Sequence, residues 1–313
     1  MFHYGHKKRT ATYVVLTLTA IFLVWAFVTF LTGAHKKIEL LDSLNKISVT
    51  SSPETYISDH DAQNALERMA KIIHEPLQPS CEVVPFGADG GANYGRHDIC
   101  RREYTTPCLV LTYGVQQEYT FELEIRKKLG CTVFALDPTV NYNAEIADGV
   151  YFIKWGAPSQ ATAEWLGPQD GWISVSPVTL SKLVATELPI PILKMDCEGC
   201  EYKLYEHIVQ LEPNFFQRVD QLAIEIHLSK NLGMATDYDA LTWGKTLVLL
   251  ERAGHKLQDV RIFSCAAVDE ATGTAQLMAE TGYANKEDQK PGDRGHCHNY
   301  LFARVGDRLR KGF

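Results

Sequence analysis

A series of short apolar runs alternates with amphipathic stretches along most of the chain. The runs have the length and composition of strands buried in a sheet. They are Leu109–Thr112, Thr132–Leu136, Val150–Ile153, Ile190–Met195, Gln221–Leu228, Lys256–Ser264 and Asn299–Val305. The helices expected around them are Asp59–His74, Thr120–Leu129, Leu180–Thr186, Tyr202–Leu211 and Tyr238–Ala253. Alternation of strand and helix predicts an α/β fold, with a mostly parallel sheet covered by helices on both faces.

A different pattern occupies the first part of the chain. Residues Thr12–Gly33 contain no charged side chain. A helix of this length, at about 1.5 Å per residue, crosses a hydrocarbon core of about 30 Å. A cleaved signal peptide is the alternative, but its apolar core is normally shorter, and Trp25 and Phe27 stand where small residues are wanted. The pattern therefore predicts a retained signal anchor.

Charges around this apolar segment predict its orientation. Lys7, Lys8 and Arg9 precede it, and such an excess of positive charge favours a cytoplasmic N-terminus. The expected organisation is a cytoplasmic tail (1–11), a transmembrane signal anchor (12–33), a stem with an N-terminal helix (34–78) and a globular domain (79–313). This is the arrangement of a single-pass type II membrane protein, with its domain in the lumen of the Golgi or the endoplasmic reticulum.

Composition limits the class of partner. Hydrophobic residues make up 45% of the chain and charged residues 22%, which provides a sizeable core and excludes wholesale disorder. The net charge is −7, and no basic stripe with interleaved aromatic residues is present. We therefore expect contact with a membrane through the single span and no nucleic-acid partner.

The eight cysteines are compatible with a lumenal domain. Cys81 and Cys100 bracket a glycine-rich segment that we interpret as a constrained loop, and we expect them to form a disulfide. Cys108 and Cys131 precede two successive strands, where pairing and buried free thiols are both open.

Two further cysteine arrangements allow alternative interpretations. Cys197-x-x-Cys200 has the spacing of a redox pair but lacks the surrounding signature, so packing beside the turn is favoured. Residues 296–298 (His-Cys-His) with Cys265 have zinc-ligand types, but their spacing matches no closed tetrahedral site. No metal site is predicted.

The densest polar chemistry follows the strand Ile190–Met195. Asp196, Glu198 and Glu201 come in close succession, with Gly199 among them. Capping of the next helix by Asp196 or Glu198 explains one acid but not all three. Because ligands of open α/β sheets bind outside the carboxyl ends of the strands, the cluster predicts a functional site.

Three other strand ends also carry polar groups. The first strand ends at Tyr113-Gly114, where glycine lets the chain turn closely against a ligand. The second ends at Asp137, an acid about 20 residues beyond that turn, where a carboxylate accepts hydrogen bonds from a ribose; a simple turn starter is the alternative. The fifth strand places Glu225 and His227 on one side, which makes His227 a candidate general base.

Together these motifs resemble a known enzyme family. LKMDCEGCEY followed by AIEIHL is similar to the FkbM-type branch of class I S-adenosylmethionine-dependent methyltransferases. PCLVLTYGVQQEYTFELEIRKKLGCTVFALDPTV resembles the membrane-anchored methyltransferase-like family of animals. The resemblance covers roughly Cys81–Val305. It implies a Rossmann-like sheet of seven strands, the last one antiparallel.

The resemblance also implies roles for individual residues. S-adenosylmethionine would be bound by Tyr113 and Gly114 at its methionine part, by Asp137 at its ribose and by Asp196 at its sulfonium and amino groups, while Glu198, Glu225 and His227 would face the acceptor. The segment Lys154–Pro158 would lie near the adenine. The expected reaction is methyl transfer to an oxygen or nitrogen nucleophile, and the sequence does not identify the acceptor.

The first turn departs from the family pattern, and two other functions stay open. The usual turn carries an acid and two or three glycines, whereas TYGVQQEY offers only Gly114, with Glu118 as the available acid. A Golgi glycosyltransferase would share the anchor, the stem and the acid-x-acid element Asp196-Cys197-Glu198, which could hold a divalent metal. A non-catalytic lumenal domain that kept the fold is the third alternative.

Overall fold

The computed structural model describes residues 56–87, 96–116, 118–157, 172–185, 188–228, 236–264 and 296–306. All of them belong to the second of two units into which the chain divides, Ser51–Phe313. The predicted tail, the anchor Thr12–Gly33 and most of the stem lie outside the described residues. Within the described ranges, no helix is both long and apolar enough to cross a membrane.

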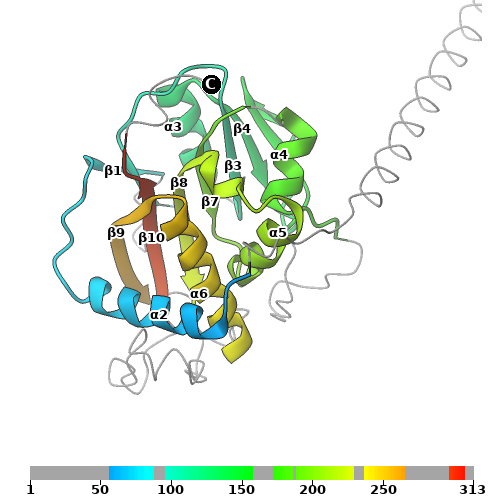
Figure 1. Ribbon diagram of the computed structural model, residues 1–313. Helices are drawn as coiled ribbons and strands as arrows, with labels where there is room; N and C mark the ends of the chain where they lie inside the picture. The colour runs from blue at the N-terminus through cyan, green and yellow to red at the C-terminus, as the bar shows by residue number, and fades with distance from the viewer. Residues whose placement is uncertain are drawn as a thin grey trace, which may run out of the picture. The chain divides into compact units, whose positions relative to one another are not determined.

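A large sheet with the strand order β5-β6-β4-β3-β7-β8-β10-β9 forms the centre of the domain (Figure 1). Its strands are β3 (Leu109–Tyr113), β4 (Thr132–Leu136), β5 (Glu145–Ala147), β6 (Val150–Ile153), β7 (Ile190–Met195), β8 (Val219–His227), β9 (His255–Ser264) and β10 (His296–Arg304). Strands β6, β4, β3, β7 and β8 run parallel to one another. The last strand, β10, is antiparallel to both β8 and β9.

All the predicted strands are present, but the sheet has eight strands within the described residues, where seven were expected. The additional strand is β5, which spans three residues and pairs antiparallel with β6 at the sheet edge. A run this short shows no apolar alternation that a sequence pattern could reveal. The long central strands were predictable because parallel strands covered on both faces read as continuous apolar runs, and every residue of β3 and β7 is buried.

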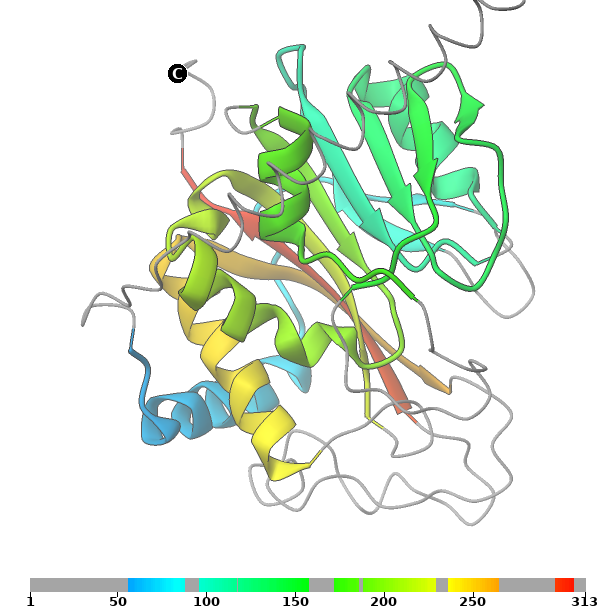
Figure 2. The same cartoon turned by 90° about the vertical axis from the view of Figure 1, so that its right-hand side faces the viewer.

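Helices cover both faces of the sheet, as predicted. They are α2 (Asp59–Ile73), α3 (Thr120–Leu129), α4 (Pro177–Ala185), α5 (Leu204–Leu211) and α6 (Asp237–Arg252). Side chains of α2, α4, α5 and α6 share one core with Leu111 and Leu193, whereas α3 shares another with Val110 and Ile192. Neighbouring residues of β3 and β7 therefore point to opposite faces, as the period of two requires. Figure 2 shows α2 (blue) and α6 (yellow) together, on the other side of the sheet from α3.

The segment Cys81–Cys100, expected to be a constrained loop, contains a second, two-stranded sheet. It pairs β1 (Val83–Phe86) with β2 (His97–Cys100) in antiparallel fashion. The side chain of Gln221 on β8 binds this small sheet: its Oε1 accepts from the Cys100 N–H at 2.7 Å, and its Nε2 donates to the Cys100 carbonyl at 3.0 Å. These contacts hold β2 against the large sheet.

Disulfides connect all the cysteines within the described residues. The predicted pair Cys81–Cys100 is confirmed, and Cys108 pairs with Cys131. A third disulfide joins Cys197 to Cys200, and Cys297 is also disulfide-bonded. A disulfide sulfur is not the thiolate that zinc requires, which argues against the zinc alternative at Cys297. Cys265 lies outside the described residues.

Candidate functional site

A cavity of about 470 Å³ lies at the carboxyl ends of β3, β4 and β7. Its lining residues are Tyr113, Gly114, Gln116, Leu136, Asp137, Pro138, Thr139, Val140, Gly156, Ala157, Trp172, Asp196, Cys197 and Glu198. The volume is in the range of small-molecule sites. Five predicted site residues are therefore brought together: Tyr113, Gly114, Asp137, Asp196 and Glu198. Glu225 and His227 do not line the cavity.

The turn after β3 requires glycine, for a reason that differs from the predicted one. Gly114 has φ +79°, and a Cβ built there would lie 1.5 Å from the carbonyl oxygen of Asp196. The Asp196 N–H in turn donates to the Tyr113 carbonyl at 3.0 Å. Gly114 thus allows the ends of β3 and β7 to meet. Glu118, the predicted substitute acid, accepts from the N–H of Thr120 at 2.7 Å at the start of α3 and is absent from the cavity lining.

Asp137 starts a turn and also lines the cavity. Its Oδ1 accepts from the N–H and hydroxyl of Thr139 at 2.7 and 2.5 Å, and its Oδ2 accepts from the Gln116 N–H at 2.8 Å. Each carboxylate oxygen can accept two hydrogen bonds. Oδ2 therefore retains one acceptor position. Both interpretations of Asp137, as a turn starter and as a ligand, are compatible with this geometry.

One residue of the cavity wall, Tyr113, has a buried polar atom. Its side chain is 1% exposed, and its hydroxyl has no hydrogen-bond partner among the described residues. Burial raises the pKa of Tyr113 well above its ordinary value, so the hydroxyl is a donor at neutral pH. A buried hydroxyl without a partner is costly unless a ligand satisfies it.

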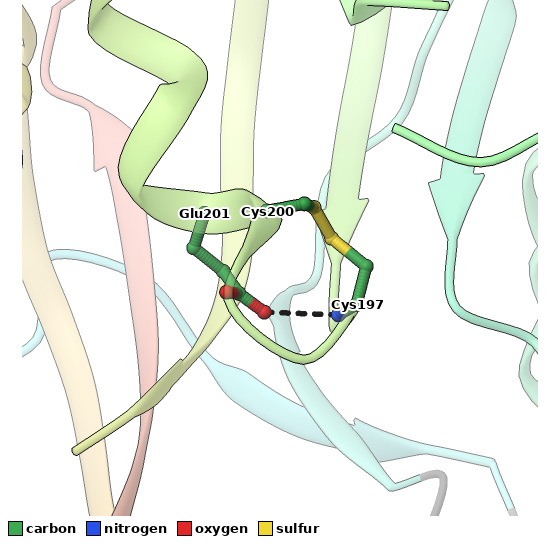
Figure 3. A group of neighbouring side chains, drawn as sticks. All are labelled: Cys197, Cys200 and Glu201. Atoms are coloured by element: carbon green, nitrogen blue, oxygen red, sulfur yellow. Dashed lines mark hydrogen bonds between the residues drawn. A yellow bond between two sulfur atoms is a disulfide. The ribbon is translucent and has the colours of Figure 1, made fainter. Parts of the chain in front are cut away.

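A disulfide and a buried carboxylate hold the turn after β7 (Figure 3). Cys197 and Cys200 are joined, and Glu201 Oε1 accepts from the Cys197 N–H at 2.9 Å. The other oxygen, Oε2, accepts from the Gly199 N–H at 2.7 Å. Neither Asp196 nor Glu198 caps the helix that follows; Glu201 instead holds the turn that precedes it. Glu198 itself has φ +57°, a left-handed conformation that is uncommon for a non-glycine residue.

His227, at the end of β8, is surrounded by carboxylates. Its Nδ1 lies 3.2 Å from Glu201 Oε1, and its Nε2 lies 3.1 Å from Glu198 Oε2. Glu225 Oε1 and Asp196 Oδ1 follow at 3.5 and 3.8 Å from the same Nε2. The ring is 2% exposed. The contact with Glu198 has the distance of an ion pair, but Glu198 Oε2 is without a properly directed hydrogen bond.

These carboxylates decide the protonation of His227. Burial by itself lowers the pKa of His227, but the charges of Glu198 and Glu201 outweigh it and raise the pKa well above its ordinary value. The ring is therefore an imidazolium at neutral pH without a ligand, and it cannot accept a proton in that state. This geometry does not favour the predicted role of His227 as a general base.

The neighbouring acids have opposite shifts. Burial, reinforced by the charge of Asp196, raises the pKa of Glu225 to about 8. Burial would also raise the pKa of Asp196, but contact with His97 and the charges of Lys194 and His227 lower it to about 2. At neutral pH Asp196 is therefore ionised and Glu225 carries a proton. Such divergent values are typical of functional sites.

Three residues of the site were missed in the sequence, two of them buried (His97 and Lys194). His97 of β2 places its Nε2 3.7 Å from Asp196 Oδ2, and burial lowers its pKa. Lys194 donates from Nζ to the Gly114 carbonyl at 2.8 Å, and Trp172 lines the cavity. A lysine within the apolar strand Ile190–Met195 was a signal that could have been read. His97 and Trp172 lie in stretches without periodicity and gave none.

The chain matches the sequence model of a family described as "Methyltransferase domain" over residues 41–245. The chain belongs to this family. The matched range extends into α6 and includes β3, β4, β7 and β8. It therefore includes the cavity and His227 with its surrounding carboxylates. Methyl transfer is therefore the class of reaction of this methyltransferase domain.

Other comparisons add less to the description of the methyltransferase domain. One solved structure that resembles it is a protein from Thermoplasma acidophilum classed as a methyltransferase by inference. The two share 10% sequence identity, and the match covers 74% of this chain and 85% of that chain with a TM-score of 0.25. This low similarity supports no conclusion. A search of curated proteins found no match.

Proposed function

We propose that the methyltransferase domain binds S-adenosylmethionine in the cavity and transfers its methyl group to an oxygen or nitrogen atom of an acceptor. The observation that carries this proposal is the charge of the cavity wall. Among the described residues, every charged side chain that lines it is acidic: Asp137, Asp196 and Glu198. An acidic wall complements a sulfonium and an ammonium group, and it repels the phosphates of nucleotide sugars or dinucleotides.

The other lining groups fit the same ligand. Oδ2 of Asp137 retains an acceptor position that suits a ribose hydroxyl. Tyr113 lines the cavity beside Gly114, where we place the methionine part of the ligand. Leu136 and Trp172 provide apolar surface of the kind that usually contacts an aromatic base.

The chain contributes position and charge to the reaction. S-adenosylmethionine supplies the electrophilic methyl group when it is bound. Asp196, ionised at neutral pH, places a negative charge at the cavity wall. Of the residues expected to face the acceptor, only Glu198 lines the cavity. Glu198 therefore contacts the acceptor, and Glu225 and His227 act behind it as positioning residues.

Isothermal titration of the full chain with S-adenosylmethionine tests the proposal. We expect saturable binding, weakened at least about tenfold by Asp137→Asn, because a bidentate acceptor of the turn and the ribose is lost. Asp148→Asn is the matched control, since the Asp148 side chain is 97% exposed and away from the cavity. Absence of S-adenosylmethionine binding, or metal-dependent binding of a UDP-sugar in its place, would contradict the proposal.

We further propose that the domain works in the lumen of the secretory pathway, on a chain anchored by residues 12–33. The disulfides Cys81–Cys100 and Cys108–Cys131 support this proposal, because such bonds persist in oxidising compartments. Protease treatment of intact microsomes is the measurement. Digestion of the domain without detergent would place it on the cytoplasmic side and contradict the proposal.

A further inference from the structure

Behind the cavity wall, Asp196, Glu198, Glu225 and His227 form a group that we call the carboxylate–histidine cluster. The ligating atoms of Asp196, Glu198 and His227 lie within 4.8 Å of one another, and the same holds for His97, Asp196 and Glu225. We propose that this cluster binds a divalent transition-metal cation, with His97 at its border. The sequence had predicted no metal site.

Distances within the cluster match the spacing of ligands around one ion. Two ligands at about 2.1 Å from a metal lie about 3.0 Å apart at a right angle and about 3.4 Å apart at a tetrahedral angle. The Nε2 atom of His227 lies 3.1 Å from Glu198 Oε2, 3.5 Å from Glu225 Oε1 and 3.8 Å from Asp196 Oδ1. Small side-chain movements would therefore complete the coordination.

The ring of His227 is oriented as in a metal site. Its Nδ1 faces Glu201 Oε1 at 3.2 Å, and Glu201 is fully buried and fixed by two backbone N–H groups. An imidazole held in this way by a carboxylate presents its Nε2 lone pair to a cation. Here Nε2 is the atom that points toward the three carboxylates.

An independent observation lies on the neighbouring strand. Asn299 of β10 is 7% exposed, and neither its Oδ1 nor its Nδ2 has a hydrogen-bond partner among the described residues. Asn299 is paired in register with Glu225, and side chains of directly opposed residues lie on the same face of a sheet. A buried amide without a partner, beside a carboxylate, indicates a missing ligand, and its oxygen is a suitable donor to a cation.

A proton on His227 does not satisfy this cluster as well as a cation would. A single N–H group donates to one carboxylate, whereas Asp196, Glu198 and Glu225 all approach Nε2. A cation at the centre contacts every one of them. Mixed imidazole and carboxylate ligands suit Mn²⁺, Fe²⁺ or Zn²⁺ better than Ca²⁺, which takes oxygen ligands.

The proposed cation would lie beside the cavity, since Asp196 and Glu198 belong to both. An acceptor hydroxyl that bound the ion from the cavity would become more acidic and would release its proton to solvent water. This last consequence rests on the proposed function, whereas binding of the cation does not.

The test is a titration of the EDTA-treated full chain with Mn²⁺, followed by the loss of the electron paramagnetic resonance signal of the free ion. We expect saturable, stoichiometric binding that also raises the thermal unfolding midpoint. Glu225→Gln and His227→Gln should each weaken binding at least about 100-fold, and Glu201→Gln, which acts through His227, by about 10- to 100-fold. Zn²⁺ should compete with Mn²⁺, and Ca²⁺ should not.

The matched control is Asp220→Asn, which removes another buried carboxylate from β8, at 3% exposure, far from His227 along the strand. This variant should bind Mn²⁺ as the wild type does. If His227→Gln does not fold, Asn299→Ala takes its place in the Mn²⁺ titration, because it is a smaller change at a proposed donor to the cation. Wild-type protein without saturable binding, or Glu225→Gln with unchanged affinity, would overturn the proposal.

A parallel titration with S-adenosylmethionine in EDTA separates the two proposals. Binding of S-adenosylmethionine without any binding of Mn²⁺ overturns the cation site alone. Binding of Mn²⁺ without S-adenosylmethionine overturns the proposed function and leaves the cation site in place.

Discussion

The two ends of the central sheet satisfy their buried polar groups in different ways. At the amino end of β8, Asp220 accepts from Arg102 at 2.7 Å and from the hydroxyl of Tyr104 at 2.6 Å. Gln221, the next residue, exchanges hydrogen bonds with the backbone of Cys100. At the carboxyl end, Glu198 Oε2 and both amide atoms of Asn299 have no hydrogen-bond partner among the described residues.

Two buried histidines, one at each end, differ in their protonation. His255, at the amino end, is 4% exposed, and burial lowers its pKa to about 3. His227, at the carboxyl end, is equally buried, yet the surrounding carboxylates raise its pKa well above the ordinary value. At the amino end, burial and the charge of Arg304 together keep the histidine neutral. The carboxyl end differs because it concentrates negative charge. We conclude that the amino end of the sheet contributes mainly to stability and the carboxyl end to chemistry.

The largest effect is expected for Gly114→Ala at the carboxyl end. The new Cβ would lie 1.5 Å from the carbonyl oxygen of Asp196, so the ends of β3 and β7 must separate. Left-handed strain and overpacking together predict a loss of roughly 3–6 kcal/mol in the free energy of unfolding, measured by urea denaturation. Binding of S-adenosylmethionine should be lost with it.

Gly254→Ala, at the amino end of β9, is the matched control. Gly254 has a similar φ of +84°, but nothing lies within 4 Å of its added Cβ. The loss should be about 1–2 kcal/mol, the cost of left-handed strain alone. Equal losses in the two variants would show that contact between β3 and β7 does not make glycine necessary at position 114.

The second effect concerns the disulfides of the two ends. Cys108–Cys131 joins the amino ends of β3 and β4 across a sequence separation of 23. Replacing both cysteines by serine should lower the free energy of unfolding by about 3 kcal/mol in the chain-entropy account and leave ligand affinity unchanged. Cys197→Ser with Cys200→Ser, at a separation of 3, should cost less stability and weaken ligand binding. If loss of Cys108–Cys131 weakened ligand binding and loss of Cys197–Cys200 did not, the assignment of stability to one end and binding to the other would be contradicted.

The smallest effect is a pH dependence at the amino end. His255 Nε2 donates to the Val219 carbonyl at 3.0 Å, the ring of Phe216 packs against it, and the charges of Arg102 and Arg304 oppose its protonation. The folded state therefore binds fewer protons than the unfolded state between the folded pKa of about 3 and the unfolded value of 6.5. Stability is complete above pH 6.5 and falls as the pH decreases below it.

Urea denaturation at pH 7 and pH 4.5 measures this contribution. The wild type should lose about 2–3 kcal/mol more than His255→Gln over this interval, because the variant has no imidazole to titrate in the unfolded state. An identical loss in the two proteins would mean that His255 is protonated in the folded state. The two ends of the sheet would then treat a buried histidine alike.

The fold was predictable where the pattern of apolar residues is long. The runs Thr132–Leu136 and Ile190–Met195 match β4 and β7 in their bounds, since strands covered on both faces read as nearly continuous apolar runs. The small sheet β1–β2 was not predictable. It is held by a disulfide and by Gln221, and contacts so distant in sequence leave no local pattern.

The candidate site was predictable in its location more than in its roles. Gly114, Asp137 and Asp196 end separate strands, and the rule for parallel sheets brings strand ends together. The state of His227 depends on Glu198 and Glu201, whose distances from the ring no spacing along the chain reveals. His97 reaches Asp196 from another sheet, which sequence alone could not show.

One buried carboxylate has a further consequence. Glu201 grips the turn of Cys197 and Gly199 with both oxygens and also touches the ring of His227. Glu201 therefore connects the loop at the cavity to the ring of His227, which does not line the cavity. A ligand that displaces this loop would also move the ring. The NMR resonances of the His227 ring nitrogens would therefore report whether the cavity is occupied.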